Sequence, residues 1–267
     1  MSAHEIIEYM ESLQNEEQRR ALMRFFKTQR PTDYGYGDEF LGLKNPQTRA
    51  IVKECRDLPL SEVPELLTCR WHEVRLCGFL IMVDRFVRNA TMRKVDDLVA
   101  IRRRDEIVQM YLQYAERANN WDLVDLTAPK ILGHWLLLPT FLGTEPDAKG
   151  NRPAEPSLNY DYKIALLDEL ADSTCLWKQR MSVVCSWMTS QHGNPTFGLR
   201  YAERHLHHPH DLMHKAVGWM LREVGKRVSM DILRDFLSEH IHEMHRTSLR
   251  YAIELMPEDE RQMWMKL

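Results

Sequence analysis

Short segments with helical periodicity follow one another along almost the whole chain. In the first of them, Ile6, Met10 and Leu13 recur at the spacing of one helix face, and no stretch shows the alternation of a strand. Such short helices cannot bury their apolar faces alone, so they must pack against one another. The sequence therefore predicts an all-α protein.

Helix boundaries are indicated by capping residues and by interruptions of the apolar pattern. Ser2 and Glu5 form a capping box before the first helix, and Ser61 is expected to cap a later one. Prolines, glycines and polar residues mark the turns. Further helices are predicted over residues 16–27, 46–56, 73–89, 95–116, 122–132, 162–171, 176–190, 196–206, 212–226, 230–240, 245–255 and from 258 to the end.

Pairs of these helices recur at roughly 40 residues without a sharp sequence repeat, which is typical of a HEAT-like solenoid. Stacked pairs curve, and their concave surface suits a long ligand better than a small one. A compact helical bundle is the alternative, although it would favour fewer and longer helices. We expect residues 1–267 to form one HEAT-like repeat domain, with a loop insertion at 143–159 where prolines and polar residues interrupt the pattern.

The composition is that of a globular protein in a reducing compartment. Hydrophobic residues make up 44% of the 267 residues, and the net charge of −3 means that nucleic-acid binding would depend on local clusters of positive charge. Five cysteines without a Cys-x-x-Cys pair argue against a disulfide framework and a cysteine zinc site. No signal peptide or membrane span is evident, so we expect a cytoplasmic monomer that uses no cofactor.

Metal binding is not expected either. A turn between two helices is rich in histidine, with His205, His207, His208 and His210 around a proline. These residues lack the fixed spacing and the partners of zinc ligands. The segment Trp71-His72-Glu73-Val74-Arg75 lacks the second histidine of a His-Glu-x-x-His helix, so a zinc hydrolase is not supported.

One heptapeptide, Asn119-Asn120-Trp121-Asp122-Leu123-Val124-Asp125, combines an indole and a carboxylate on one helix face. Asp122 suits the start of a helix, but Asp125 follows among apolar residues, where burying a lone carboxylate is costly. Asp125 is therefore either solvated in a groove or paired with a cation. The alternative is an exposed acidic residue beside a core tryptophan.

Three other motifs place a tryptophan beside charged residues. A separate segment is predicted to be a loop. The loop segment, Tyr34-Gly35-Tyr36-Gly37-Asp38, is either a packed turn or a loop that approaches a ligand closely. Taken singly, each tryptophan indicates core packing. The three motifs are Trp71-His72-Glu73-Val74-Arg75, Trp177-Lys178-Gln179-Arg180 and Gly218-Trp219-Met220-Leu221-Arg222.

Together, the ordered motifs resemble those of the DNA alkylation repair glycosylases built from HEAT-like repeats. The similarity runs over most of the chain, from Phe40-Leu41-Gly42 with Pro46 and Arg49 to the segment 215–223. Two departures stand out. The insertion before Tyr162 is longer than the family pattern suggests, and Phe25 stands where some members carry a tyrosine that faces the DNA.

The resemblance implies a site as well as a fold. It assigns the catalytic carboxylate to Asp125 and an aromatic cleft around the lesion nucleotide to Trp121 and Trp219, with Arg180 completing the cleft. An N3- or N7-alkylated purine is already a cation, so its glycosidic bond can break without protonation while a carboxylate stabilises the charge that develops on the sugar. The implied activity is release of such bases from duplex DNA.

A non-catalytic HEAT-like scaffold that binds DNA or protein is the alternative function. A scaffold has no need of a carboxylate such as Asp125 in a groove that binds phosphates, which favours the enzyme. The cations that follow Trp219, namely Arg222, Lys226 and Arg227, are expected to face DNA phosphates. The run Arg102-Arg103-Arg104 is interpreted as a solvated surface.

Overall fold

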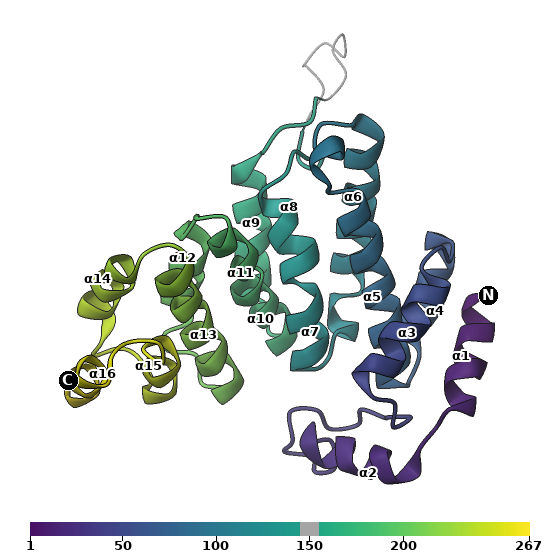
Figure 1. The fold of residues 1–267 in the computed structure, drawn as a ribbon, viewed down its shortest axis with the longest axis horizontal. Coiled ribbons are helices and arrows are strands. Elements are labelled where there is room, and N and C mark those ends of the chain that lie inside the picture. The colour runs from purple at the N-terminus through teal and green to yellow at the C-terminus, as the bar shows by residue number, and fades with distance from the viewer. Residues whose placement is uncertain (145–154) are drawn as a thin grey trace. The chain divides into compact units, whose positions relative to one another are not determined.

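The computed structural model describes residues 1–144 and 155–267. This part of the chain is helical, and β pairing within it is limited to two isolated bridges, Glu39 with Trp71 and Thr140 with Ser157. It divides into two compact units, Met1–Thr127 and Ala128–Leu267, called here the N-terminal and C-terminal units (Figure 1). The prediction of an all-α fold is confirmed.

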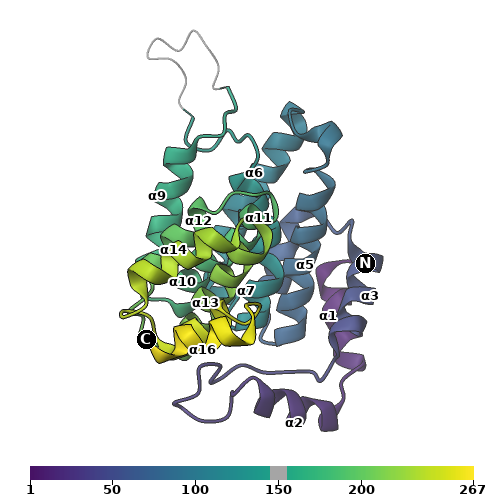
Figure 2. The same ribbon diagram turned by 60° about the vertical axis from the view of Figure 1, so that its left-hand side comes forward.

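In the N-terminal unit, α3 and α4 pack on α5, which also contacts α6 and α7, while α1 packs on α4. In both views, α2 and the loop after it cross beneath the lower ends of α3 and α5 (Figures 1 and 2). The elements are α1 (Ala3–Ser12), α2 (Glu16–Phe25), α3 (Asn45–Cys55), η1 (Leu60–Glu62), α4 (Val63–Thr68), α5 (His72–Arg88), η2 (Met92–Lys94), α6 (Leu98–Gln113), η3 (Ala115–Arg117) and α7 (Trp121–Thr127).

Helix α5 forms the centre of the N-terminal unit. Every residue from His72 to Met82 is buried, so the helix has no solvent-facing side over that length. A helix that is buried all round belongs to the interior of a protein. Its first turn brings the polar side chains of His72 and Glu73 into the core, where each must find a partner.

Capping explains some of the helix ends and corrects one prediction. The capping box of Ser2 and Glu5 is present, since the Glu5 carboxylate accepts the Ser2 amide at 2.7 Å. The prediction that Ser61 caps a helix is wrong, because Ser61 lies inside η1. The following helix α4 instead begins at Val63, with Pro64 in its first turn, where the missing amide hydrogen and the fixed φ of proline are tolerated.

In the C-terminal unit, α13 packs against α10, α11, α12, α14 and α15. The elements are the π-helix η4 (Pro129–Gly133), α8 (His134–Leu136), α9 (Tyr160–Ala171), α10 (Leu176–Val184), α11 (Ser186–Gln191), α12 (Thr196–Arg204), α13 (Asp211–Arg227), α14 (Met230–His240), α15 (Arg246–Ala252) and α16 (Glu258–Lys266).

Two helices predicted as continuous are interrupted. The helix predicted over 122–132 ends at Thr127, and a π-helical segment that begins with Pro129 follows it. Proline has no amide hydrogen to continue the helical bonding, and π-helical turns occur as local interruptions of α-helices. The helix predicted over 176–190 is divided at Cys185 into α10 and α11.

Close packing of α13 and α15 explains the glycine of the Gly-Trp-x-Leu-Arg motif. A Cβ atom at Gly218 would lie 2.3 Å from the backbone oxygen of Ser248, which no side chain could tolerate. The absence of a side chain therefore lets α15 approach the backbone of α13. This contact fixes α13 immediately before Trp219.

Within each unit the main contacts join helices that are close in sequence. This packing is that of a helical-repeat solenoid, so the predicted fold class is confirmed. The concave DNA-binding surface and the single domain over 1–267 stay predictions. Of the insertion predicted at 143–159, residues 145–154 lie outside the described residues, and Thr140 and Ser157 exchange two backbone hydrogen bonds on either side of it.

Candidate functional site

The start of α7 is held by polar side chains of its own segment. Asn120, which is fully buried, accepts the Trp121 amide with its Oδ1 at 2.9 Å, and Asp122 Oδ1 accepts the Leu123 amide at 2.9 Å. These acceptors bind amides that the first turn of a helix leaves unpaired. Trp121 and Asp125, four residues apart, are both half-buried, whereas Leu123 is fully buried.

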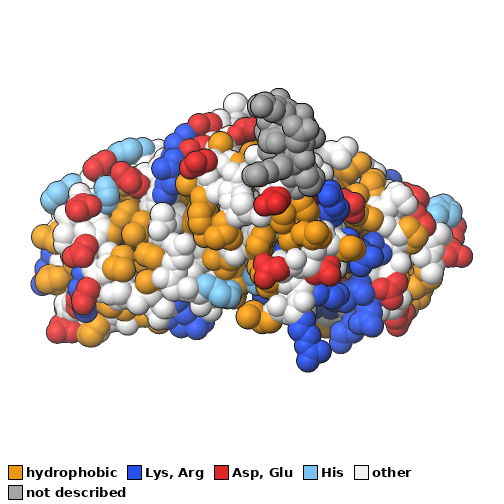
Figure 3. Space-filling model, turned by 90° about the horizontal axis from the view of Figure 1, so that it is seen from above, with side chains coloured by type: hydrophobic (Ala, Val, Ile, Leu, Met, Phe, Trp, Pro, Cys, Tyr) orange, Lys and Arg blue, Asp and Glu red, His pale blue; other side chains and the backbone are white. Residues whose placement is uncertain are grey.

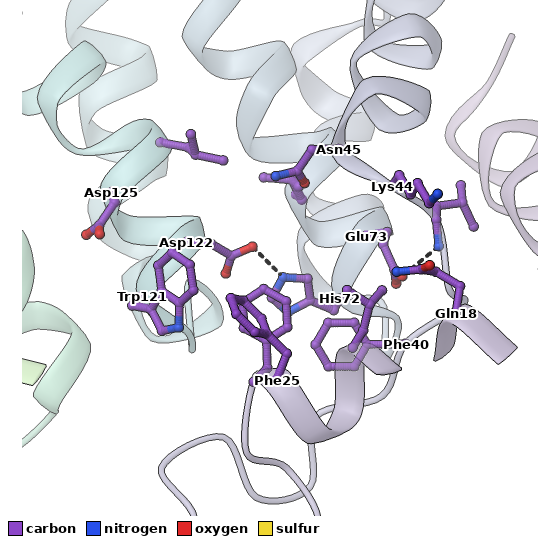
Figure 4. Close-up of a pocket in the computed structure, with 15 residues that line it drawn as sticks. Gln18, Phe25, Phe40, Lys44, Asn45, His72, Glu73, Trp121, Asp122 and Asp125 are labelled. Carbon is purple, nitrogen blue, oxygen red and sulfur yellow. Dashed lines mark hydrogen bonds and ion pairs between the residues drawn. The ribbon is translucent and has the colours of Figure 1, made fainter. Parts of the chain in front are cut away.

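A pocket of about 400 Å³ in the N-terminal unit opens beside this helix (Figure 4). Helices α2, α3, α5 and α7 and the loop before α3 contribute its walls. Its apolar side chains are Leu22, Phe25, Phe26, Phe40, Leu43, Leu76, Trp121 and Leu126. Its polar side chains are Gln18, Lys44, Asn45, His72, Glu73, Asp122 and Asp125.

Three aromatic rings contact one another at the pocket, and one of them is largely exposed. The side chain of Phe25 is 64% exposed, and its ring centroid lies 5.9 Å from that of Trp121 in an edge-to-face arrangement. Phe26 lies beneath, with its centroid 5.4 Å from Trp121. Aromatic faces attract cations and stack on bases, so the exposed ring of Phe25 can serve as a stacking surface.

The wall of the pocket contains a buried ionic chain. His72, only 2% exposed, contacts Asp38 Oδ2 through Nδ1 at 2.7 Å and Asp122 Oδ2 through Nε2 at 3.0 Å. Arg75 donates to the other oxygen of Asp38. Figure 4 shows Asp122 and His72 directed toward each other. Two carboxylates and two cations are thus buried together, as the cost of burying charge requires.

The proton on His72 follows from these neighbours. Burial alone would lower the pKa of His72, but the carboxylates of Asp122 and Asp38 outweigh it and raise the pKa to about 10. Burial would likewise raise the pKa of Asp38, yet contacts with His72 and Arg75 hold it below its ordinary value. His72 is therefore an imidazolium that donates both ring hydrogens to carboxylates, so neither is directed at a ligand.

The loop between α2 and α3 is a packed turn. Glu73 accepts the amides of Leu41 at 2.9 Å and Gly42 at 2.8 Å, which ties the loop to α5. A Cβ atom at Gly35 would lie 2.7 Å from the Phe26 carbonyl oxygen. Phe40 stacks on the His72 ring with centroids 4.4 Å apart, so this loop shapes the pocket from behind.

Two residues of the predicted site belong to the C-terminal unit. Trp219 on α13 is half-buried. Arg180 on α10 is buried and donates from Nη1 to the Leu212 carbonyl at 2.5 Å, at the start of α13. Because both residues lie in the other unit, their placement beside Trp121 and Asp125 stays a prediction.

The predicted phosphate-binding residues on α13 differ in their neighbours. Arg222 pairs with Glu254, and Arg227 Nε lies 3.5 Å from Glu223 Oε2. Lys226 is exposed and makes no ion pair or side-chain hydrogen bond with any residue that the structure describes. Its charge is therefore the least compensated of the three.

Part of the run 102–104 is not a solvated surface. Arg104 is fully buried and donates Nη1 to the carbonyls of Asn89 at 2.7 Å and Lys94 at 2.9 Å, which holds the turn after α5. The prediction is wrong for this residue, whereas Arg102 and Arg103 are exposed. The face seen in Figure 3 carries acidic and basic side chains intermixed, with Lys and Arg gathered over one part.

The histidine-rich turn has structural contacts. His205 is buried, with Nε2 3.3 Å from Ser182 Oγ, and His208 Nε2 lies 2.9 Å from Gln179 Oε1. His210 accepts the Leu212 amide at 3.1 Å and so caps α13. Over residues 1–144 and 155–267 no group of three or more acidic, cysteine or histidine side chains is arranged to hold a metal ion.

Three members of the ionic chain were not recognised from the sequence as parts of the site. The sequence pattern places Asp38 either in a packed turn or in a loop that approaches a ligand, and it indicates Asp122 as a helix-start residue and His72 as part of an incomplete zinc motif. Their partners lie 34 and 50 residues away, which no local pattern reports. His72 and Asp122 occur inside motifs that carry the family resemblance, whereas Asp38 precedes the first of these motifs, so the sequence offers no such signal for it.

The fold and the pocket define a helical-repeat protein with an aromatic, acidic site. A family model described as DNA alkylation repair enzyme matches residues 6–143 and 156–256, and the chain belongs to that family. No curated protein matches the sequence. Among solved structures, a predicted DNA alkylation repair enzyme from Enterococcus faecalis is similar, with 14% identity, a TM-score of 0.59 and coverage of 92% of this chain and 97% of that one.

That structural similarity supports the fold alone, since the identity is low. None of the described helices is both long enough and apolar enough to cross a membrane.

The raised pKa of His72 makes stability depend on pH. A group whose pKa is higher in the folded chain stabilises the fold below its ordinary pKa of 6.5, and that contribution is lost as the pH rises toward about 10. The difference in free energy of unfolding between the wild type and His72→Gln should therefore be largest below pH 6.5 and shrink as the pH rises from 6.5 toward about 10. Urea unfolding at a series of pH values measures this difference.

Arg104→Gln is the matched control, because a guanidinium stays protonated over this range. Its difference from the wild type should not change with pH. A His72→Gln difference that is equally constant would show that His72 does not carry the proton assigned to it.

Proposed function

We propose that this protein is a DNA glycosylase that excises cationic N3- and N7-alkylated purines from duplex DNA. The observation that carries the proposal is a half-buried carboxylate, Asp125, on a pocket that it shares with the half-buried ring of Trp121 and the exposed ring of Phe25. The family, described as DNA alkylation repair enzymes, supports a role in repair.

Asp125 acts on charge that develops during bond cleavage. The C1′–N bond breaks, its electron pair passes to the cationic purine, and the base leaves as a neutral molecule. Positive charge grows on the deoxyribose, where a fixed carboxylate stabilises it more strongly than water would. Water then bonds to C1′ and releases one proton to solvent, and Asp125 orients this water.

The aromatic residues recognise the charged substrate. Trp121 and Trp219 are assigned to the cleft around the lesion nucleotide, where their faces attract a cationic base or sugar. Phe25, next to Trp121, adds a stacking surface. Arg180 is assigned to bind a phosphate or to keep Asp125 ionised. The enzyme works as a monomer and without a cofactor in this proposal.

Duplex binding is assigned to cations on α13. Lys226 has the least compensated charge, while Arg222 and Arg227 are paired with glutamates that DNA phosphates would have to replace. These contacts position the duplex without reading its sequence.

The first test removes the charge of the carboxylate. Asp125→Asn should lower the rate of 7-methylguanine release by about 100-fold or more, because an electrostatic term of several kcal/mol leaves the transition state. Duplex binding should be kept or tightened, since a negative charge has left a surface that faces phosphates. Single-turnover release and a binding titration on the same duplex measure both effects.

Asp235→Asn is the control, because it removes an exposed carboxylate from α14 and leaves the site intact. It should release the base at the wild-type rate. Near wild-type release by Asp125→Asn would remove Asp125 from the mechanism, whereas no release by the wild type would favour a scaffold that only binds DNA.

The second test concerns the charge of the lesion. His72, the histidine of the pocket, has both ring nitrogens bound to carboxylates, so it is not placed to protonate a leaving base. Without protonation, a base leaves readily only if it departs as a neutral molecule. We expect release of 3-methyladenine and 7-methylguanine but not of uracil or 1,N6-ethenoadenine, measured as strand breaks after alkali. Efficient excision of uracil would require an acid that this site does not provide.

The third test compares two cations of α13. Lys226→Ala should weaken binding to modified and unmodified duplex alike and reduce the slope of log affinity against log salt by about one unit. Arg222→Ala should change the slope less, because Glu254 already compensates its charge. Lys53→Ala, which removes an exposed lysine of α3, serves as the control. An unchanged slope for Lys226→Ala would remove this residue from the DNA interface.

A further inference from the structure

The buried ionic chain joins three segments that are far apart in sequence. Asp38 lies in the loop after α2, His72 begins α5 and Asp122 lies in the first turn of α7. We propose that His72 is a positioning residue, which fixes the start of α7 by bridging Asp38 and Asp122 and thereby holds Trp121 and Asp125 in place. The inference rests on the proposed function for its effect on base release.

Helix α7 needs such an anchor because it is short. It has seven residues, from Trp121 to Thr127, and an isolated helix of this length is not stable in water. Asp122 follows Trp121 directly and precedes Asp125 by three residues. A shift of the Asp122 carboxylate would therefore move the indole and the catalytic carboxylate with it.

Only a doubly protonated ring can form this bridge. Each carboxylate accepts a hydrogen, and a neutral imidazole has just one N–H to donate. The ring is also fixed by its neighbours, because Phe40 stacks on it at 4.4 Å and Phe26 lies 5.2 Å away. Phe26 contacts the ring of Trp121 as well, at 5.4 Å, so a second path joins His72 to the aromatic surface.

The other end of the bridge is held independently. Arg75 donates to Asp38 and, from Nη1, to the carbonyls of Arg70 at 2.7 Å and Cys69 at 3.0 Å. Asp38 is thus fixed to the turn before α5. His72 transmits that fixed position to α7, and electrostatic catalysis depends on such placement, since an error of about 1 Å in a reacting group costs about 100-fold in rate.

The experiment compares two buried cations of the same unit. His72→Gln removes the bridge to α7, and Arg104→Gln removes a buried cation that donates to the carbonyls of the turn after α5. Both should lower the melting temperature. At a temperature where both are folded, His72→Gln should release 7-methylguanine about tenfold or more slowly than the wild type, whereas Arg104→Gln should stay close to it.

A second readout does not depend on catalysis. Hydrogen exchange of the peptide 119–127, followed by mass spectrometry, should be faster in His72→Gln than in Arg104→Gln. If the wild type releases no base, the proposed function fails, and this exchange still decides whether His72 positions α7. Equal hydrogen exchange of this peptide in the two variants, or an equal loss of base release, would overturn the proposal. His72 would then contribute to stability without positioning α7.

Variants of Asp122 keep the proposal testable if His72→Gln does not fold. Asp122→Asn retains an oxygen that can accept the imidazolium hydrogen, and it should keep most of the base release. Asp122→Leu removes the acceptor and should lose release and protection of the 119–127 peptide together. Equal release by the two variants would show that the hydrogen bond to His72 does not position the site.

Discussion

A protonated histidine between two buried carboxylates connects the parts of the N-terminal unit that form the pocket. Neither Asp38 nor Asp122 could be buried ionised without a cation, and His72 could not be buried charged without them. Each member therefore depends on the others. These ion pairs join the loop after α2, the first turn of α5 and the start of α7, which are parts of the pocket wall.

The helices were predictable because their signals are local. Spacing of apolar residues and the capping box of Ser2 depend on neighbours in sequence, so the all-α class and most ranges agree with the structure. The error at Ser61 arose because Pro64 belongs to the first turn of α4, which begins at Val63. The division at Cys185 falls in a segment without proline or glycine, so no local signal marks it. At Thr127, a π-helical turn interrupts a pattern that reads as one helix.

Some residues of the candidate site could be predicted from the sequence, and others could not. Trp121 and Asp125 could be singled out because an indole and a carboxylate four residues apart share a helix face. The bridge from His72 to Asp38 and Asp122 could not, because it spans 34 and 50 residues and a histidine pattern does not reveal its partners. The requirement for glycine before Trp219 could not be predicted either. It results from a close backbone contact with Ser248, which lies 30 positions further along the chain.

Two carboxylates of one short helix lie in different environments. Asp122 is buried against the charge of His72, so its field outside the protein is largely cancelled. Asp125, three residues further on, is half-buried and lines the pocket beside aromatic rings. Because the charge of Asp122 is neutralised by His72, a cationic ligand in the pocket would interact mainly with the carboxylate of Asp125. Both residues belong to one seven-residue helix, so the bond between Asp122 and His72 also determines the position of Asp125.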